Sequence, residues 1–325
     1  MNKTVFSLLA LLLIASCAEQ EYRVEGCFSA PDGTIVYLIN REQTDTLAAT
    51  TVGENRFSFE GQVREPFYAY IGTGKQRIHT ILEPGVIKVN LDERTSEGTP
   101  MIDAYNAFHK RFYKFSREQR EEKTALADSV VCANPGNLVG ALALEDLAHV
   151  NPERFLSLYE QVSERVQVFY LVESAYEAAL VQQRTAPGQP FTDYTVPGGN
   201  PDGSDVKLSD YVGRGKYILL DHWASWCGPC KAEVPYIKKT WEAFHGDRFE
   251  VVGIAVSDKR EDTLSALEKL DMPWPQILDG GRIPKELYGV SAIPHLILFG
   301  PDGTILERGL RGDMIFETVG RYLDK

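Results

Sequence analysis

Residues 217–231 read YILLDHWASWCGPCK and join an apolar run to a pair of closely spaced cysteines. The run 217–220 is apolar at every position, which is typical of a strand buried on both faces. Cys227 and Cys230 follow this run, and a helix is expected to begin at the pair. The segment therefore predicts a strand that leads directly to two thiols at the start of a helix.

The residues that follow alternate between strand and helix patterns. Residues 251–256 and 296–299 are further apolar runs of strand length, and residues 263–270 between them have the pattern of a helix. Strands that alternate with helices are typical of an open α/β sheet. The turn-forming segment 185–190, TAPGQP, interrupts the preceding helical pattern and marks the entrance to this domain.

Segment 221–231 resembles the active-site segment of thioredoxins in sequence and in context. A second segment, residues 288–296, reads YGVSAIPHL and is similar to the thioredoxin stretch that carries a cis-proline facing the cysteines. The resemblance covers about residues 185–325, and the longer approach and extra helix resemble the membrane-tethered branch typified by the TlpA and ResA proteins. It implies an α/β thioredoxin-like domain and a thiol-disulfide oxidoreductase.

The position of the two cysteines at a helix start has a chemical consequence. Unpaired N–H groups and the helix dipole favour negative charge there, so the thiolate of Cys227 is expected to be stabilised. Cys227 is the predicted nucleophile, and Cys230, one turn later, would attack it to release the product. Pro229 suits the helix start because its missing N–H would be unpaired anyway.

Three further residues receive roles from the resemblance. Asp221 would be the buried acid that exchanges a proton with Cys230 through water, although the tethered branch commonly carries Asn there; a locally hydrogen-bonded carboxylate is the alternative. Pro294 is expected to follow a cis bond, which would let the backbone of Ile293 pair with a substrate, and an ordinary trans proline is the alternative. Trp226 is expected to shield the cysteines or simply to pack.

Two histidines and two other cysteines lie outside this scheme. His222 and His295 with the Cys pair would be chemically sufficient for a zinc site, but the surrounding sequence is a poor metal signature. We therefore predict no metal and no cofactor, with His222 a packed strand residue and His295 a residue that tunes access. Cys27 and Cys132 are interpreted as buried thiols, and a disulfide between them is left open.

The first seventeen residues have the pattern of a targeting segment. Lys3 precedes a nearly all-apolar run at 5–14, which is too short to cross a bilayer. Residues 14–17, IASC, resemble the lipobox of bacterial lipoproteins, which implies a signal peptide at 1–16 and a lipidated Cys17. The protein would then face the periplasm from the cell envelope, membrane-anchored through Cys17; an ordinary secretory signal is the alternative. Export would let disulfides persist.

Residues 17–100 are predicted to form a β-rich domain. Polar and apolar residues alternate at 56–60 and 87–91, and turn signals such as Pro84-Gly85 separate the runs. The pattern resembles the β-rich N-terminal domain of unknown function that is often fused to membrane-tethered thioredoxins.

Residues 101–184 are predicted to be helical. Four aromatic residues recur at helical spacing and are interpreted as a packing face rather than a ligand site: Tyr105, Phe108, Phe112 and Phe115. Asn151 is the expected cap of a later helix, with Pro152 at its first position. That helix is expected to carry one continuous apolar face from Phe155 to Val166.

Composition limits the partners. A chain of 325 residues exceeds one usual core, so two or three packing units are expected. A net charge of −12 would repel phosphate backbones, which makes nucleic acid an unlikely partner. Protein disulfides or dithiols and an envelope electron donor are the expected partners, with reduction as the favoured direction. A redox-inert binding scaffold and a thiol peroxidase are the alternatives.

Overall fold

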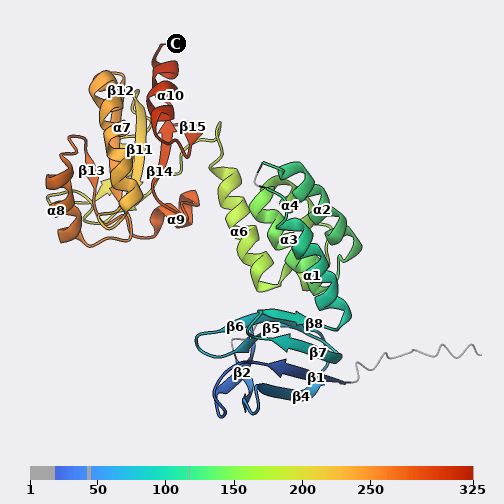
Figure 1. Cartoon of the computed structure of the whole chain (residues 1–325). Coiled ribbons are helices and arrows are strands. Elements are labelled where there is room, and N and C mark those ends of the chain that lie inside the picture. Colours follow the sequence, from blue (N-terminus) through green and yellow to red (C-terminus); the bar gives the residue numbers. More distant parts are fainter. Residues whose placement is uncertain (1–18, 42–44, 117, 325) are drawn as a thin grey trace, which may run out of the picture. The chain divides into compact units, whose positions relative to one another are not determined.

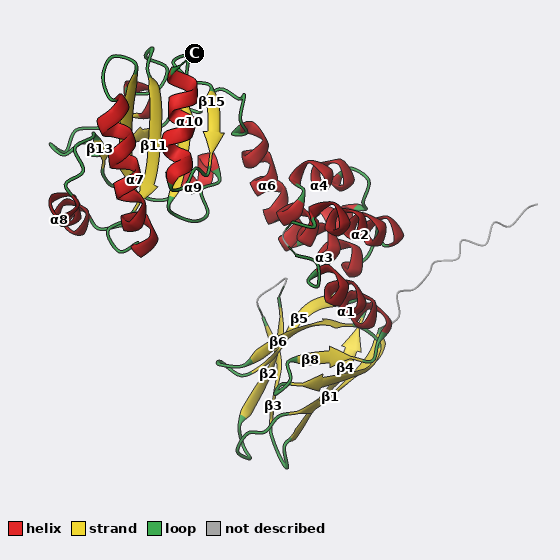
Figure 2. Cartoon of the chain, turned by 45° about the horizontal axis from the view of Figure 1, so that its top comes forward, coloured by secondary structure: helices red, strands yellow, loops and turns green. Residues whose placement is uncertain are grey.

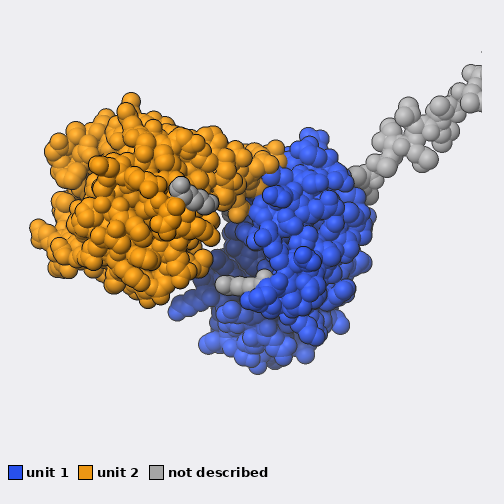
Figure 3. All heavy atoms as spheres, turned by 90° about the horizontal axis from the view of Figure 1, so that it is seen from above, with its two compact units in different colours: residues 1–175 blue, residues 176–325 orange. Residues whose placement is uncertain are grey.

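The computed structural model describes residues 19–41, 45–116 and 118–324. The chain divides into two compact units, residues 1–175 and 176–325 (Figure 3). Cys17 and the predicted signal peptide lie outside the described residues. None of the helices in the described ranges combines the length and the apolar character that a membrane crossing requires.

The first unit begins with two four-stranded sheets (Figure 1). The strand orders are β4-β1-β7-β8 and β3-β2-β5-β6. The strands are β1 (Gln20–Cys27), β2 (Ile35–Asn40), β3 (Thr46–Thr51), β4 (Arg56–Val63), β5 (Phe67–Gly72), β6 (Arg77–Leu82), β7 (Gly85–Asn90) and β8 (Thr95–Glu97).

The alternation in these strands explains why the sheets pack face to face. Val24 on β1 and Ile87 on β7 share one buried core with Leu38 on β2 and Ile71 on β5. Every second residue of a strand points to the same face, so each sheet turns one set of apolar side chains toward this core. The opposite face is not exposed throughout, since Ile81 on β6 is fully buried there. The predicted β-rich N-terminal region is confirmed.

Six helices follow, as the sequence predicted for the middle of the chain. They are α1 (Pro100–Phe112), α2 (Arg120–Ala133), α3 (Leu138–Val150), α4 (Pro152–Tyr159), α5 (Glu164–Gln167) and α6 (Tyr170–Arg184). The side chain of Asn151 accepts a hydrogen bond from the N–H of Arg154, so it caps α4 as expected.

Two expected helical faces are shorter than predicted. Helix α1 ends at Phe112 with Tyr113 as its C-cap residue, and the N–H of Lys114 bonds to the carbonyl of Arg111, only three residues back. Phe115 lies outside the helix. Helix α4 ends at Tyr159, and Val166 belongs to α5. Phe155 of α4 and Val166 of α5 are nevertheless both buried. The apolar residues of two successive helices therefore looked like one continuous helical face in the sequence.

The second unit is built on a five-stranded sheet in the order β13-β12-β11-β14-β15. Its elements are β9 (Thr195–Val196), β10 (Val206–Lys207), a 3-10 turn (Leu208–Asp210), β11 (Tyr217–Trp223), α7 (Gly228–Phe244), β12 (Phe249–Ala255), α8 (Arg260–Leu270), β13 (Gln276–Ile277), α9 (Ile283–Tyr288), β14 (His295–Phe299), β15 (Ile305–Arg308) and α10 (Asp313–Leu323). The central strand β11 pairs in parallel with β12 and antiparallel with β14. The expected α/β architecture is confirmed.

Successive residues of β11 face opposite sides of this sheet. Leu219 packs in the core that includes Ile237 of α7 and Ile315 of α10 (Figure 2). Leu220 packs in a second core on the other face. By the same alternation Asp221 faces the α7 side of the sheet.

Candidate active site

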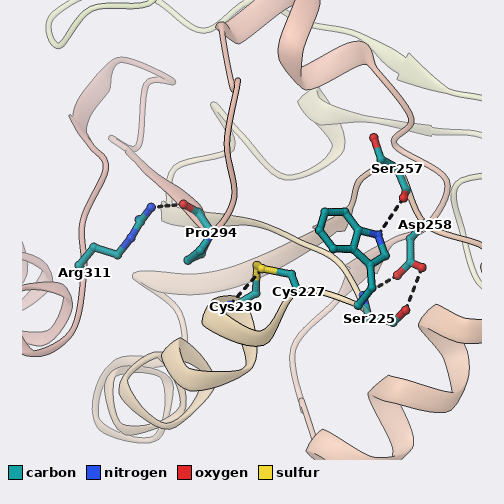
Figure 4. The surroundings of a disulfide bond; sticks show 8 residues. Ser225, Cys227, Cys230, Ser257, Asp258, Pro294 and Arg311 are labelled. Atoms are coloured by element: carbon teal, nitrogen blue, oxygen red, sulfur yellow. Dashed lines mark hydrogen bonds between the residues drawn. A yellow bond between two sulfur atoms is a disulfide. The ribbon is translucent and has the colours of Figure 1, made fainter. Parts of the chain in front are cut away.

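Cys227 and Cys230 form a disulfide at the N-terminus of α7 (Figure 4). The two residues are only 3% and 2% exposed. Cys227 is the N-cap residue, and its sulfur accepts a hydrogen bond from the N–H of Cys230 at 3.1 Å. The structure thus brings together the two thiols that the sequence singled out, with the Cys227 sulfur directed at a helix N–H.

The first turn of α7 favours negative charge on the Cys227 sulfur. It contains no acidic residue, and Pro229 occupies one of its first two positions. The N–H groups of a first helical turn have no partner inside the helix, and the dipole adds a partial positive charge there. Both effects stabilise a thiolate at Cys227 relative to its thiol.

The segment before Cys227 is fixed to the loop that follows β12. Ser225 donates hydrogen bonds to Asp258 from its N–H and, at 2.8 Å, from its hydroxyl, and Trp226 donates from its indole Nε1 to the carbonyl of Ser257 at 2.9 Å (Figure 4). The Trp226 residue is 61% exposed. It therefore presents an apolar surface beside the disulfide while its one donor is satisfied.

Asp258 was not identified from the sequence. Burial raises the pKa of its carboxyl, whereas hydrogen bonds from Ser225, Thr263 and the N–H of Lys259 lower it, and the net shift is downward. A carboxylate that receives several donors holds a loop firmly. The contact joins segments 33 residues apart, so local sequence patterns contained no signal for it.

Asp221 is buried on the same face of the sheet as α7, with 2% of its surface exposed. Its Oδ1 atom has no hydrogen-bond partner within the described part of the chain. Burial raises the pKa of Asp221 to about 7, while the positive charge of Arg311 lowers it and the negative charge of Glu233 raises it. The carboxyl can therefore gain or lose a proton near neutral pH, as proton exchange with a thiol would require.

The bond between Ile293 and Pro294 is cis, as predicted. Arg311 donates a hydrogen bond from its guanidinium to the carbonyl oxygen of Pro294 (Figure 4). Glu233, on α7, accepts a hydrogen bond at 2.9 Å from the N–H of Gly312. Arg311 thus touches the proline loop directly and acts electrostatically on Asp221.

Glu233 and Arg311 were also missed by the sequence reasoning. Glu233 lies one helical turn after Cys230, and that spacing could have indicated that it shares a face with the thiols. Arg311 had no comparable signal, because its contact with Pro294 depends on how the chain turns after β15.

His222 and His295 are neutral at neutral pH. Burial lowers the pKa of His222 to about 3 and that of His295 to about 4, and the positive charge of Arg308 lowers both further. The His222 Nδ1 atom lies 2.8 Å from the carbonyl oxygen of His295. His222 faces away from Asp221, and the described residues contain no group of three or more His, Cys, Asp or Glu that could hold a metal ion.

The interpretation of Cys27 and Cys132 as buried thiols was wrong. Both are exposed and neither is in a disulfide. Cys27 ends β1 on the face opposite to the buried Val24, and Cys132 lies on α2 with its sulfur 3.5 Å from an Asp128 oxygen. Cysteine favours burial on average, but the alternation along β1 sets the side on which Cys27 lies.

Two family models match separate parts of the chain. Residues 187–308 match the AhpC/TSA family, and residues 22–116 match a domain of unknown function, DUF4369. Thiol-disulfide oxidoreductase ResA of Bacillus subtilis is 29% identical over 123 residues, which cover 38% of this chain and 67% of that protein. Residues 187–308 form a thioredoxin-like thiol-disulfide oxidoreductase domain.

Other relatives of this domain are also named thiol-disulfide oxidoreductases. ResA of Bacillus thuringiensis is 27% identical over 125 residues, covering 38% of this chain and 70% of that protein. The thioredoxin domain of a thiol-disulfide oxidoreductase from Bacteroides vulgatus is 34% identical, with 42% of this chain and 97% of that chain covered and a TM-score of 0.39. The two ResA relatives confirm the predicted class of enzyme for the oxidoreductase domain.

Proposed function

We propose that this protein reduces disulfides of other proteins in the cell envelope through Cys227 and Cys230. The observation that carries the proposal is the disulfide at the start of α7, with a buried carboxyl, Asp221, on the same face of the sheet. Relatives named thiol-disulfide oxidoreductase support the chemistry. The direction and the substrates are part of the proposal.

The proposed cycle starts from the reduced pair. The Cys227 thiolate attacks one sulfur of a substrate disulfide, and the other substrate sulfur leaves as a thiolate that takes up a proton. Asp221, as a carboxylate, accepts the proton of the Cys230 thiol through water. The Cys230 thiolate then attacks the Cys227 sulfur, which releases the second substrate sulfur.

The cycle transfers two electrons to the substrate and leaves Cys227 and Cys230 joined. That product is the oxidised form described above. A membrane or envelope electron donor must return two electrons before the next cycle. The exposed Trp226 and the backbone of Ile293 beside the cis-proline are the proposed contacts for an extended substrate segment.

Trapping of a mixed disulfide tests this function. Cys230→Ala removes the second thiol, so covalent complexes between Cys227 and substrate proteins should accumulate and disappear on addition of dithiothreitol. Cys132→Ala is the matched control, because Cys132 is also a cysteine on a helix but belongs to the other unit. An inert scaffold would trap nothing, and a thiol peroxidase would instead consume peroxide.

The direction of exchange is tested by a redox titration of the Cys227–Cys230 pair against glutathione or dithiothreitol. A potential near the thioredoxin value, about −270 mV, would support reduction. A potential near that of DsbA, about −120 mV, would contradict it and indicate an oxidant.

We propose that Cys17 is lipidated and anchors the protein to a membrane. The support is the lipobox-like segment 14–17 after a short apolar run. Two or more acyl chains on one cysteine suffice for stable anchoring. Cys17→Ser should move the protein from the membrane fraction to the soluble fraction and remove the mass of the lipid; unchanged fractionation and mass would contradict the anchor.

A further inference from the structure

A cavity lies in the first unit against the sheet β3-β2-β5-β6, on the face opposite to the core that the two sheets share. It has a volume of about 300 Å³. We call it the arginine pocket, and its lining is Tyr37, Ile39, Arg41, Tyr70, Gly72, Thr73, Gly74 and Arg77. None of these residues belongs to the second unit.

The strand register places the lining residues in two rows. Gly72 lies directly between Tyr37 on β2 and Arg77 on β6. Residues directly opposite in neighbouring strands share a face. The backbone of Gln76 and Arg77 fills the space where a Gly72 side chain would stand, so only Tyr37 and Arg77 extend side chains from this row. Ile39 and Tyr70 form the next row and close one end with an apolar wall.

Two positive charges are held at this hollow. The guanidinium carbon of Arg41 lies 4.1 Å from the centre of the Tyr70 ring, and that of Arg77 lies 4.8 Å from the same centre. The two charges are therefore less than about 10 Å apart, close enough to repel each other. Stacking on a tyrosine face attracts each cation but does not neutralise either charge.

No acidic partner neutralises the pair within the described part of the chain. None of the ion pairs found there involves Arg41 or Arg77, and the buried Nε atom of Arg41 has no hydrogen-bond partner. The protein as a whole carries a net charge of −12. Two close, unpaired guanidinium groups in such an acidic protein indicate a position that an external anion would stabilise.

His79 adds no third charge. Its ring lies 4.4 Å from that of Tyr70, and burial, followed by the charges of Arg41 and Arg77, lowers its pKa. The pocket therefore has two positive charges at neutral pH, set against an apolar wall.

From this geometry we infer that the arginine pocket binds a small organic carboxylate that carries an apolar group. The carboxylate would accept hydrogen bonds from the guanidinium groups of Arg41 and Arg77, whose planar donor pairs match its two oxygens. The apolar group would lie against Tyr37, Ile39 and Tyr70. A cavity of about 300 Å³ suits a small molecule, at the lower end of the range for ligand sites.

Binding to the full chain tests the inference, with three probes measured by ligand-observed NMR titration. Phenylacetate carries both recognised groups, phenylacetamide is its neutral counterpart, and inorganic phosphate is an anion without an apolar group. We expect phenylacetate to bind with a dissociation constant on the order of 1 mM and the other two at least about tenfold more weakly. Added salt should weaken phenylacetate binding.

Arginine variants locate the site. Arg77→Gln and Arg41→Gln should each weaken phenylacetate binding about tenfold, since each removes one charge-assisted partner. Arg23→Gln is the matched control: it removes the same charge from β1, in the other sheet, and should change binding less than about twofold. Circular dichroism verifies that each variant is folded, and the comparison of the three probes needs no variant.

Several results would overturn the inference. They are equal binding of phenylacetate and phenylacetamide, equal binding of phosphate and phenylacetate, an equal effect of Arg23→Gln, and no saturable binding about tenfold above the expected dissociation constant. Replacing both catalytic cysteines, as Cys227→Ser with Cys230→Ser, should leave phenylacetate binding unchanged. This result separates the pocket from the exchange function, so one proposal can fail without the other.

Discussion

Asp221 holds a carboxyl group whose protonation couples the site to the stability of the domain. Its pKa is raised from 3.8 to about 7 in the folded protein, chiefly by burial. Between these two values the folded protein keeps a proton that the unfolded chain has lost. The free energy of unfolding therefore falls as the pH rises from about 4 to about 7, by about 4 kcal/mol in all.

This linkage gives a prediction for Asp221→Asn. An amide cannot ionise, so the variant should lose that pH-dependent fall and be more stable than the wild type at pH 8, by up to about 4 kcal/mol. Urea unfolding of the oxidised protein from pH 5 to pH 8 measures the difference. Asp247→Asn, at an exposed acid, is the control and should track the wild type. A stability difference that does not vary with pH would contradict the raised pKa.

The buried histidines act in the opposite sense and at lower pH. The pKa values of His222 and His295 are lowered to about 3 and about 4 from 6.5. The unfolded chain then binds protons that the folded protein does not, so stability is lost as the pH falls below about 6.5. The lowered pKa of Asp258 acts in the same sense, so these residues together lower the stability of the domain in acid. Asp221→Asn should leave their contribution in place.

At the scale of elements, helix caps stabilise the middle of the first unit. The side chain of Asn137 accepts hydrogen bonds from the N–H groups of Val139 at 3.0 Å and Gly140 at 3.3 Å at the start of α3. Helix α3 is buried over most of its length, so its first turn depends on this cap for donors that water cannot reach.

Asn137→Ala should therefore lower the free energy of unfolding of the first unit by about 1 kcal/mol. Ser163→Ala is a matched control, because Ser163 is the N-cap residue of α5 but its side chain makes no capping hydrogen bond. Thermal unfolding followed by circular dichroism compares the two variants. Equal losses would show that the Asn137 hydrogen bonds do not stabilise the helix.

The elements also show how far sequence patterns reach. The spacing of Cys227 and Cys230 and the apolar run before them were sufficient to place a strand, a turn and a helix start. The face on which Asp221 lies follows from the alternation along β11 only once the structure places Leu219 in the core under α7. Arg311 could not be placed, because its contact with Pro294 depends on tertiary packing. Cys27 was misassigned because average burial was preferred to strand alternation.

At the scale of the whole molecule, the chain is two units with separate cores. The sandwich core and the cores on either face of the second sheet share no residue. Each unit has enough buried apolar surface to unfold as a cooperative body, so two thermal transitions are expected.

Only one of these transitions should respond to reduction. Opening the Cys227–Cys230 disulfide frees a loop of four residues in the unfolded second unit, which costs that unit about 2 kcal/mol in the chain-entropy description. Calorimetry with and without dithiothreitol should lower one transition and leave the other unchanged. The Cys227→Ser, Cys230→Ser double variant is the control and should be insensitive to dithiothreitol; a shift of both transitions would contradict separate unfolding.

The alternation along β11 decides which titratable side chain lies on the same face of the sheet as the cysteines. Asp221 and His222 are neighbours in the chain and lie on opposite faces of the sheet. Burial disfavours the charged form of both, so it raises the pKa of the acid to about 7 and lowers the pKa of the base to about 3. Deleting one residue upstream in this strand would exchange them without altering any side chain. The imidazole of His222 would then take the place of the Asp221 carboxyl near the thiols. A deletion outside the active site would therefore have the effect of an active-site substitution.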